Sequence, residues 1–238
     1  MQQELRDIVQ SSRRIVFFGG AGVSTASGIP DYRSKSGLYN RQGKRSPEEM
    51  LSHTFFMKHT QEFYDFYRSN LLHLDAQPND AHRALAVLQQ QQKLAAIVTQ
   101  NVDGLHQKAG NTHVFELHGS VWRNFCMACS TSYSAYEVAH AEGVPHCDCG
   151  GIIKPDVVLY EEPLDDEVVG KAVTIIASAD TLVVGGTSLA VYPAAGMLRY
   201  FAGDNLVLIN QTPTSYDHHA SLIIREPIDQ VLREAVGL

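Results

Sequence analysis

The chain has 238 residues, of which 44% are hydrophobic and 19% charged, and this suits a globular protein with one core plus at most a small appendage. Its formal net charge of −7 argues against a nucleic-acid-binding protein, which normally carries a basic stripe. No apolar stretch approaches the roughly 20 residues that span a bilayer, and residues 1–14 carry charges without the apolar core of a signal peptide. The sequence therefore predicts a cytoplasmic protein that contacts neither membranes nor nucleic acid.

Six short apolar runs predict the strands of an open sheet. Most of them are continuous rather than alternating, as expected of parallel strands that are buried on both faces. Several end in Gly, Asn, Asp or Ser, at the edge where open α/β sheets bind their ligands. The fold class expected from this pattern is α/β. The six runs are Ile15–Phe18, Ala95–Thr99, Val114–Leu117, Thr181–Val184, Leu206–Ile209 and Leu222–Ile224.

Two insertions between these strands predict a second, smaller domain. The first is too long for one crossover and is expected to be mostly helical, with another helix over 80–92 at its end. Within it Ser46 has the features of an N-cap, Pro47 suits the first helical position, and Glu49 completes a capping box. The predicted division is 1–28, 93–122 and 156–238 for the sheet domain, with 29–92 and 123–155 forming a composite small domain.

All four cysteines fall in the second insertion. Cys126 and Cys129, followed by Cys147 and Cys149, predict two thiolate pairs on one tetrahedral Zn²⁺. Disulfides are the alternative, but a reducing cytoplasm disfavours them. The second pair is C-x-C, one residue shorter than the usual knuckle, so the adjacent His146 is a substitute ligand to consider. Four protein ligands leave the metal no open position, which makes the predicted site structural.

A glycine-rich turn, Gly19–Ser24, follows the first predicted strand and leads into an expected helix. Such a turn lets backbone N–H groups approach a pyrophosphate closely. A Rossmann fingerprint would have a third glycine where Thr25 stands and an acidic residue at the end of the second strand, and both are missing. From this turn alone, an unrelated α/β protein stays an open alternative.

Polar residues at four other strand ends strengthen the case for a dinucleotide site. A second glycine turn, Gly185–Ser188, follows one strand and precedes an expected helix, and Asn210 follows another strand. The polar segment 100–103 follows a third predicted strand, and His118 follows a fourth. Because these ends meet at one edge of a parallel sheet, they predict an enzyme that binds a dinucleotide and uses His118 as a general base.

The motifs together resemble those of the sirtuins, in the family's order and over nearly the whole chain. The matching segments are GAGVSTASGIPDYR (20–33), TQNVDGLH (99–106), ELHGS (116–120), the cysteine quartet, KPDVVLYEE (154–162), GGTSLAVYP (185–193) and LIN (208–210). The resemblance implies a Rossmann-like domain and a small domain of helical module plus zinc ribbon, with the active site between them. It also implies a monomer that consumes NAD to remove acyl groups from protein lysines, releasing nicotinamide and O-acyl-ADP-ribose.

The resemblance also implies roles for individual residues. His118 would be the base that activates a ribose hydroxyl, and Asn101 and Asp103 would belong to the catalytic nicotinamide pocket. The residues implied in NAD binding are Ala21, Gly22, Thr25, Tyr32, Arg33, Gln100, Val102, Asp103, His118, Gly186, Thr187, Ser188, Asn210 and Ile228. Those implied at the edges where a substrate peptide inserts as a strand are Val158, Tyr160 and Val191.

Two related activities stay open as alternatives: removal of other acyl groups, and ADP-ribosyl transfer to proteins. Sirtuins that prefer succinyl or malonyl lysine carry a Tyr-x-x-Arg pair in the small domain. Here Tyr64 occupies the first position but Tyr67 the second, and Arg68 comes one residue too late, which turns it by about 100° on a helix. The sequence therefore predicts a preference for acetyl and other neutral acyl groups.

Overall fold

The computed structural model describes residues 2–34, 37–40 and 45–238. Its main sheet has six parallel strands in the order β3-β2-β1-β7-β8-β9. Each strand predicted from the sequence is confirmed, within one residue at each end, and β1 and β7 are buried along their whole length. The strands are β1 Ile15–Gly19, β2 Leu94–Thr99, β3 Val114–Glu116, β7 Thr181–Gly185, β8 Asn205–Ile209 and β9 Leu222–Ile224.

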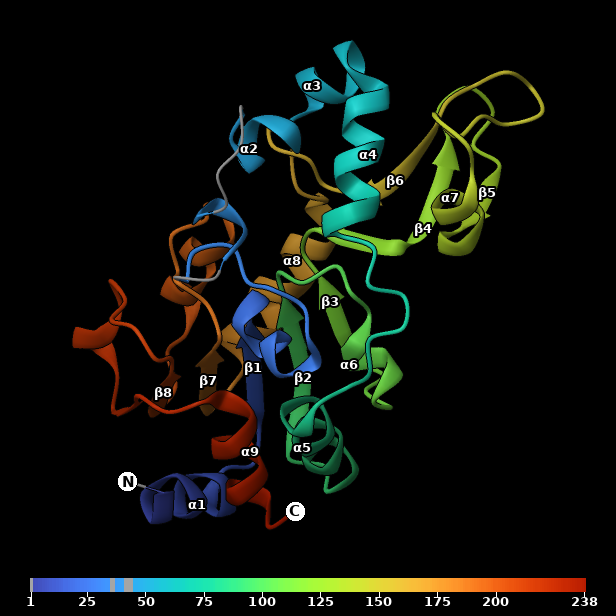
Figure 1. Cartoon of the computed structure of the whole chain (residues 1–238). Helices are drawn as coiled ribbons and strands as arrows, with labels where there is room; N and C mark the ends of the chain where they lie inside the picture. Colours follow the sequence, from blue (N-terminus) through green and yellow to red (C-terminus); the bar gives the residue numbers. More distant parts are fainter. Residues whose placement is uncertain (1, 35–36, 41–44) are drawn as a thin grey trace.

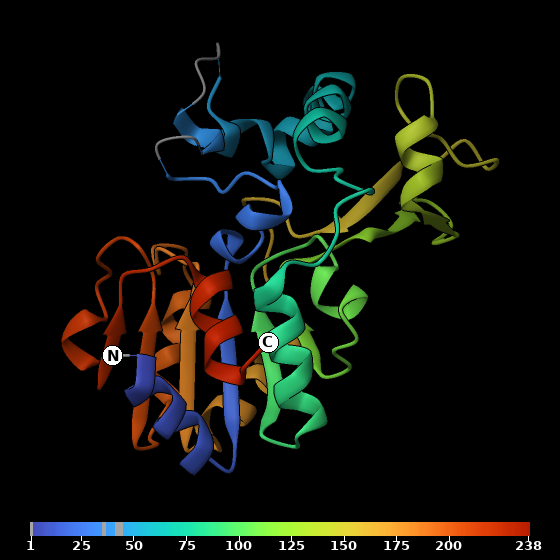
Figure 2. The ribbon, with the colours of Figure 1, turned by 60° about the horizontal axis from the view of Figure 1, so that its bottom comes forward.

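Helices cover both faces of this sheet, as in a Rossmann-like domain (Figure 2). On one face α1 (Gln2–Ser11), α5 (Asp80–Gln90) and α9 (Ile228–Val236) share a core with β1, β2 and β8. On the other face α8 (Asp166–Ala177) and the 3-10 helix η4 (Ala194–Tyr200) pack against the same strands. No helix in the described part of the chain is long and apolar enough to cross a bilayer.

A smaller domain lies beyond the carboxyl ends of these strands (Figure 1). Its helical part is α2 (Pro47–Met50), α3 (His53–Lys58) and α4 (Thr60–Asn70). Its second part is an antiparallel sheet in the order β5-β4-β6, with the short helix α7. One apolar core joins both parts, so the composite small domain expected from the sequence is present. The remaining bounds are β4 Gly119–Cys126, β5 Ser132–Ser134, β6 Ile153–Val157, α6 Leu105–Lys108, α7 Ala135–His140, η3 Leu38–Asn40 and η5 Asp217–His219.

Three helical expectations need refinement. The predicted N-cap is present, since the Ser46 side chain accepts from the Glu49 N–H with Pro47 at the first position, but that helix ends after one turn. The helix that follows each glycine turn is a 3-10 helix instead of an α-helix. Finally, α5 lies within 29–92, yet its buried side chains join the core of the large sheet. We therefore propose that the first insertion ends before α5.

The two glycine turns touch each other backbone to backbone. The Gly22 N–H donates to the Gly186 carbonyl at 2.8 Å, and Gly186 has a φ of +61°. A Cβ on Gly186 would lie 2.4 Å from the backbone nitrogen of Val23, and one on Gly22 would lie 2.8 Å from Cα of Gly186. Only glycine fits at this contact, which holds the ends of β1 and β7 together.

We predict that Gly186→Ala lowers the free energy of unfolding by about 2–4 kcal/mol, since it combines left-handed strain with a clash against backbone. Gly170→Ala is the matched control, because Gly170 lies inside α8 with no atom within 4 Å of an added Cβ. In that control, the free energy of unfolding should rise by roughly 0.5–1 kcal/mol. Urea denaturation of both variants measures the difference, and equal stabilities would contradict the tight contact.

Candidate active site

A cavity of about 830 Å³ lies between the two domains, at the carboxyl ends of the central strands. It opens where β1 has β2 on one side and β7 on the other, which is the switch point where ligands of open α/β sheets bind. Almost every site residue expected from the sequence lines it. These are Ala21, Gly22, Thr25, Tyr32, Arg33, Gln100, Asn101, Val102, His118, Val158, Tyr160, Gly186, Thr187, Ser188, Val191, Asn210 and Ile228.

Asp103 is the exception, because it lies behind the cavity wall. Its Oδ2 accepts from the Ser24 hydroxyl at 2.6 Å, and its Oδ1 accepts from the Leu105 N–H at 2.9 Å. Ser24 Oγ also accepts from Nδ2 of Asn101 at 3.1 Å. Burial raises the pKa of Asp103, while these hydrogen bonds to the carboxylate oppose that rise. Asp103 therefore fixes the first glycine turn and, through Ser24, the amide of Asn101.

His118 is held in one orientation at the end of β3. Its Nδ1 lies 2.9 Å from the Gln100 carbonyl, and since a carbonyl only accepts, Nδ1 is the donor. Burial lowers the pKa of His118, with a smaller opposing effect from this hydrogen bond. Near neutral pH the ring is therefore neutral, and its lone pair is on Nε2. That arrangement suits a general base.

Gln100 ties His118 to the second glycine turn. The Gln100 N–H donates to the Gly19 carbonyl at 2.9 Å, and its side-chain amide donates to Thr187 Oγ1 at 3.0 Å. Thr187 Oγ1 also accepts from the Leu189 N–H at 3.2 Å. The floor of the cavity is thus one connected set of hydrogen bonds between four strand ends, those of β1, β2, β3 and β7.

The far end of the cavity is formed by β8 and the start of α9. The Asn210 side chain donates to the Thr212 carbonyl at 2.8 Å, and Arg225 donates to the Asn210 carbonyl at 2.9 Å. Ile228 packs directly on Gly185, where an added Cβ would lie 2.2 Å from its Cδ1. This apolar wall with one polar strand end suits the adenosine half of a dinucleotide.

The loop after the first glycine turn covers the cavity. Leu38 and Tyr39 donate their N–H groups back to the carbonyls of Asp31 and Tyr32, at 2.8 and 2.9 Å. The two tyrosine rings lie 5.4 Å apart, and the Arg33 guanidinium lies 5.1 Å from the Tyr39 ring centre. Burial raises the pKa of Tyr32 to about 12, so its hydroxyl stays protonated. Sequence reasoning missed Tyr39, whose hydroxyl bonds to that of Tyr160.

The expected substrate edge continues from β6. The Val158 N–H donates to the His118 carbonyl at 3.0 Å, and Tyr160 forms a parallel bridge with Ser52. Glu161 has a left-handed φ of +76°. Its carboxylate accepts from the Thr54 N–H at 2.8 Å, at the start of α3. The bridge to Ser52 and the hydrogen bond to Thr54 therefore fix this edge against the helical module, beside the cavity.

The four cysteine sulfurs lie within 4.8 Å of one another, and none of them is in a disulfide. Cys126 and Cys149 are 3.5 Å apart, as are Cys129 and Cys147. A tetrahedral zinc with Zn–S bonds of about 2.3 Å holds its sulfurs nearly 3.8 Å apart, so the cluster fits Zn²⁺. His146 is not in this group, and its Nδ1 donates to the Val144 carbonyl at 2.7 Å. The quartet, rather than His146, supplies the ligand set.

Comparisons with known proteins agree with this geometry. A family model described as the Sir2 family matches residues 20–193. A NAD-dependent protein deacetylase of Clostridium acetobutylicum is 56% identical over 237 residues, covering 98% of this chain and 97% of that protein. One of Clostridium perfringens is 54% identical over the same shares. The chain belongs to the Sir2 family. The resemblance read from its motifs is therefore confirmed.

Solved structures of the Sir2 family superpose on the whole chain. One, described as Sir2 with a deacetylated p53 peptide and 3′-O-acetyl ADP ribose, has a TM-score of 0.91 at 34% identity, covering 99% of this chain and 97% of that one. Another, described as Sir2 bound to a p53 peptide and NAD⁺, has a TM-score of 0.88 at 34% identity, covering 100% and 98%. The two-domain Sir2 fold expected from the sequence is confirmed.

The helix α4 carries the residues that bear on acyl preference in this Sir2 protein. Tyr64 and Tyr67 are buried in the small-domain core, and neither lines the cavity. The Arg68 guanidinium donates to the carbonyls of Val138 and Gly143, at 3.0 and 2.7 Å. Arg68 thus binds the zinc-ribbon part of the small domain instead of facing the cavity.

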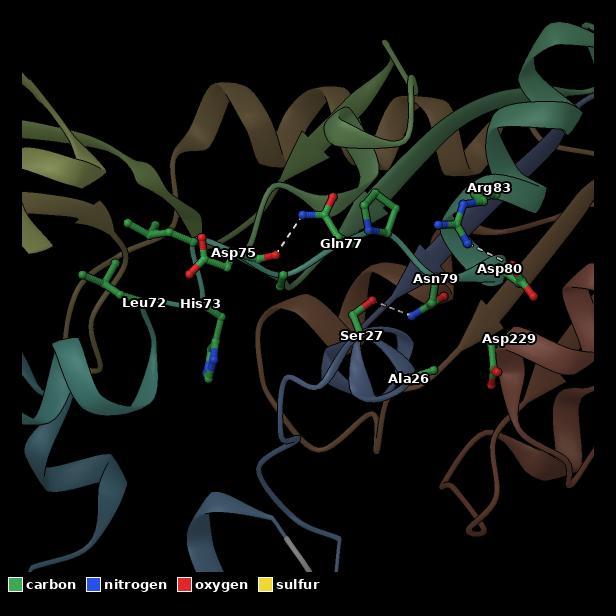
Figure 3. A pocket seen from close by; sticks show the side chains of 13 residues that line it. Ala26, Ser27, Leu72, His73, Asp75, Gln77, Asn79, Asp80, Arg83 and Asp229 are labelled. Carbon is green, nitrogen blue, oxygen red and sulfur yellow. Dashed lines mark hydrogen bonds and ion pairs between the residues drawn. The ribbon is translucent and has the colours of Figure 1, made fainter.

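A second cavity of about 740 Å³ lies beside the first glycine turn (Figure 3). It is lined by η2 (Thr25–Ser27), the segment 72–79 and the starts of α5 and α9. None of the site residues expected from the sequence lines it. Asn79 points toward Ser27 across its floor, and the two side chains are joined by a 3.0 Å hydrogen bond.

We predict that the protein copurifies with one zinc per chain and that chelation lowers its thermal stability, because the metal joins two segments of the small-domain core. Cys147→Ser should lose the zinc and fold poorly, whereas His146→Ala should keep one zinc per chain. Elemental analysis of both variants measures the ratio of zinc to protein chains. Full zinc in Cys147→Ser with loss in His146→Ala would overturn this ligand set.

Proposed function

We propose that the protein is an NAD-dependent protein-lysine deacetylase, which converts NAD, acetyl-lysine and one water molecule into nicotinamide, free lysine and O-acetyl-ADP-ribose. The observation that carries the proposal is His118, a neutral, oriented imidazole at the meeting point of the dinucleotide cavity and the peptide edge. The names of the bacterial relatives support it, as does the acetyl-ADP-ribose in a similar solved structure.

NAD supplies the ADP-ribosyl group that accepts the acyl group. The residues proposed to hold its pyrophosphate are those of the first glycine turn, where Ala21, Gly22 and Thr25 line the cavity. Gly186, Thr187, Ser188, Asn210 and Ile228 are proposed to hold the adenosine half, and Tyr32 and Arg33 to cover the nicotinamide ribose.

Asn101, with Gln100 and Val102, is proposed to form the nicotinamide pocket, and the carboxylate of Asp103 is proposed to act from directly behind its wall. Loss of nicotinamide leaves positive charge on the sugar, and preorganised dipoles and a carboxylate stabilise such a charge without reorganisation. Ser24 holds both groups in place, through its hydrogen bonds to the Asn101 amide and the Asp103 carboxylate. His118 is proposed to take the proton of a ribose hydroxyl on Nε2, since Nδ1 is occupied by the Gln100 carbonyl.

The substrate is proposed to be an acylated lysine within an extended peptide segment, bound as a strand between Val158 and Tyr160 on one side and Val191 on the other. Backbone pairing of this kind gives modest sequence selectivity.

The proposed setting is cytoplasmic, with the enzyme acting as a monomer. It is proposed to act without nucleic acid, as the net charge of −7 favours. Zinc has a structural role only, because four cysteines fill its coordination sphere.

Acetyl and other neutral acyl groups are the proposed substrates. The cation that a succinyl carboxylate would require is not supplied by Arg68, which donates to two backbone carbonyls of the zinc-ribbon part. A carboxylate buried without a cation carries a penalty of several kcal/mol. Preference for acetyl over succinyl by at least about tenfold, or 1.4 kcal/mol, follows from this arrangement.

We predict that His118→Ala lowers kcat/KM for deacetylation by at least about a hundredfold, the lower end of what a general base contributes. The affinity for NAD should change little, and exchange of free nicotinamide into NAD should survive in part, because that first step does not use the base. Steady-state turnover, calorimetric NAD titration and the exchange assay measure these three quantities. A folded variant with unchanged turnover would remove His118 from the reaction.

A further inference from the structure

Two buried histidines lie behind the cavity and have no part in the proposed chemistry. His82 on α5 and His106 on α6 are 0% and 1% exposed, and their ring centres are 4.8 Å apart. Within the described residues, no hydrogen-bond partner meets Nε2 of His82 or either ring nitrogen of His106. Phe17 of β1 packs edge-on against the His106 ring at 6.1 Å. Two neighbouring imidazoles in so apolar a place need an explanation.

One of the pair is linked to the first glycine turn. His82 Nδ1 accepts from the backbone N–H of Asn79, the N-cap of α5, at 3.3 Å. The side-chain amide of Asn79 donates to the Val23 carbonyl at 2.8 Å and to Ser27 Oγ at 3.0 Å, the latter drawn in Figure 3. Because Nδ1 of His82 is an acceptor here, the neutral ring carries its proton on Nε2. A doubly protonated His82 cannot accept this bond.

The other histidine is linked to the nicotinamide-pocket segment. His106 lies in the single turn of α6, whose first residue, Leu105, donates its N–H to Asp103. The Asn111 side-chain amide donates to the backbone carbonyls of His106 and His82, at 3.1 and 3.3 Å. These bonds join α5 to α6.

These contacts form a closed circuit of linked residues behind the cavity. Asp103 bonds to Ser24 of the first glycine turn, that turn bonds to Asn79, and Asn79 bonds to His82. The circuit is completed by the contact of His82 with His106, and by α6, which connects His106 back to Asp103. The histidine pair is therefore one of the links between two walls of the cavity, the first glycine turn and the segment that contains Asp103.

We infer that His82 and His106 are positioning residues that hold these two walls together only while both imidazoles are neutral, so that affinity for NAD falls at acid pH. This inference rests on the proposed function, because it takes the cavity to be the NAD site. A proton on either ring would place a charge in this apolar site. The charged group that acts on His82 is Arg83 of α5, which adds like charge, and the group that acts on His106 is His82 itself. Phe17 of β1, which packs on the His106 ring, is neutral, and so is Asn111, which bonds to the backbone carbonyls of both histidines.

The sign of the pH effect follows from burial. Desolvation lowers the pKa of His82 to about 4 and holds the pKa of His106 well below its ordinary value. When α5 and α6 separate, both rings return to an ordinary pKa of about 6.5. At a pH between the lowered and the ordinary pKa, each fall of one pH unit favours the form in which α5 and α6 are separated. The effect is up to about tenfold per histidine. The closed cavity is therefore intact above pH 6.5 and weakens as the pH falls below it.

The test is calorimetric titration of NAD into the full-length, zinc-loaded protein at pH 7.5, 6.5 and 5.5. The dissociation constant of the wild type should rise as the pH falls from 6.5 to 5.5, by no more than about tenfold for each histidine. His82→Gln keeps a capping-box acceptor at N3 but does not titrate, so its dissociation constant should match the wild type at pH 7.5. At pH 5.5 it should rise less than that of the wild type, since only His106 still titrates. His106→Gln should flatten the profile in the same way, and His82→Ala should bind NAD weakly at every pH because the cap acceptor is gone.

His140→Gln is the matched control, since His140 is an exposed histidine on α7, and it should keep the full acid loss of the wild type. A wild-type profile that is flat, or glutamine variants at both positions that retain the acid loss, would overturn the inference. If His82→Gln fails to fold, the His106→Gln profile decides alone. Absence of NAD binding by the wild type at pH 7.5 would instead count against the proposed function itself.

Discussion

The backbone contact between the two glycine turns is the constraint on which the rest of the site depends. Gly22 and Gly186 meet with no room for a Cβ, and this brings the carboxyl ends of β1 and β7 together. From one turn, Ser24 holds Asn101 and Asp103. From the other, Thr187 holds Gln100, whose carbonyl orients His118. A short-range steric requirement at two glycines thereby sets the geometry of groups that come from four separate strand ends.

Burial shapes the protonation of His118 and Asp103 in the site. Desolvation favours the neutral forms of both His118 and Asp103, but hydrogen bonds from Ser24 and Leu105 oppose this for the carboxylate. His118 has a single hydrogen bond at Nδ1, which leaves its other nitrogen for proton transfer. The environment thus separates the roles of the two groups, one as base and one as anchor of the wall.

The sequence predicted the strands and most of the cavity because both depend on local patterns. Continuous apolar runs indicate buried parallel strands, and polar residues at their ends must then converge on one edge. Tyr39 and the contact between His82 and His106 join distant segments, so no local pattern indicates them. The packing of α5 on the large sheet depends on tertiary contact in the same way, since an amphipathic helix suits either core. His146 adjoins a ligand in sequence, but its bridge to Ile152 and its bond to Val144 keep it from the sulfur cluster.

The central claim is that an acyl group moves from lysine to the ADP-ribose part of NAD in this cavity. The most direct measurement is mass analysis of the products formed from NAD and two peptides of one sequence, bearing acetyl-lysine or succinyl-lysine. The account predicts nicotinamide, free-lysine peptide and O-acetyl-ADP-ribose in equal amounts from the acetyl peptide, with succinyl turned over at least about tenfold more slowly. ADP-ribose attached to peptide or protein, with the acetyl group still on lysine, would contradict it.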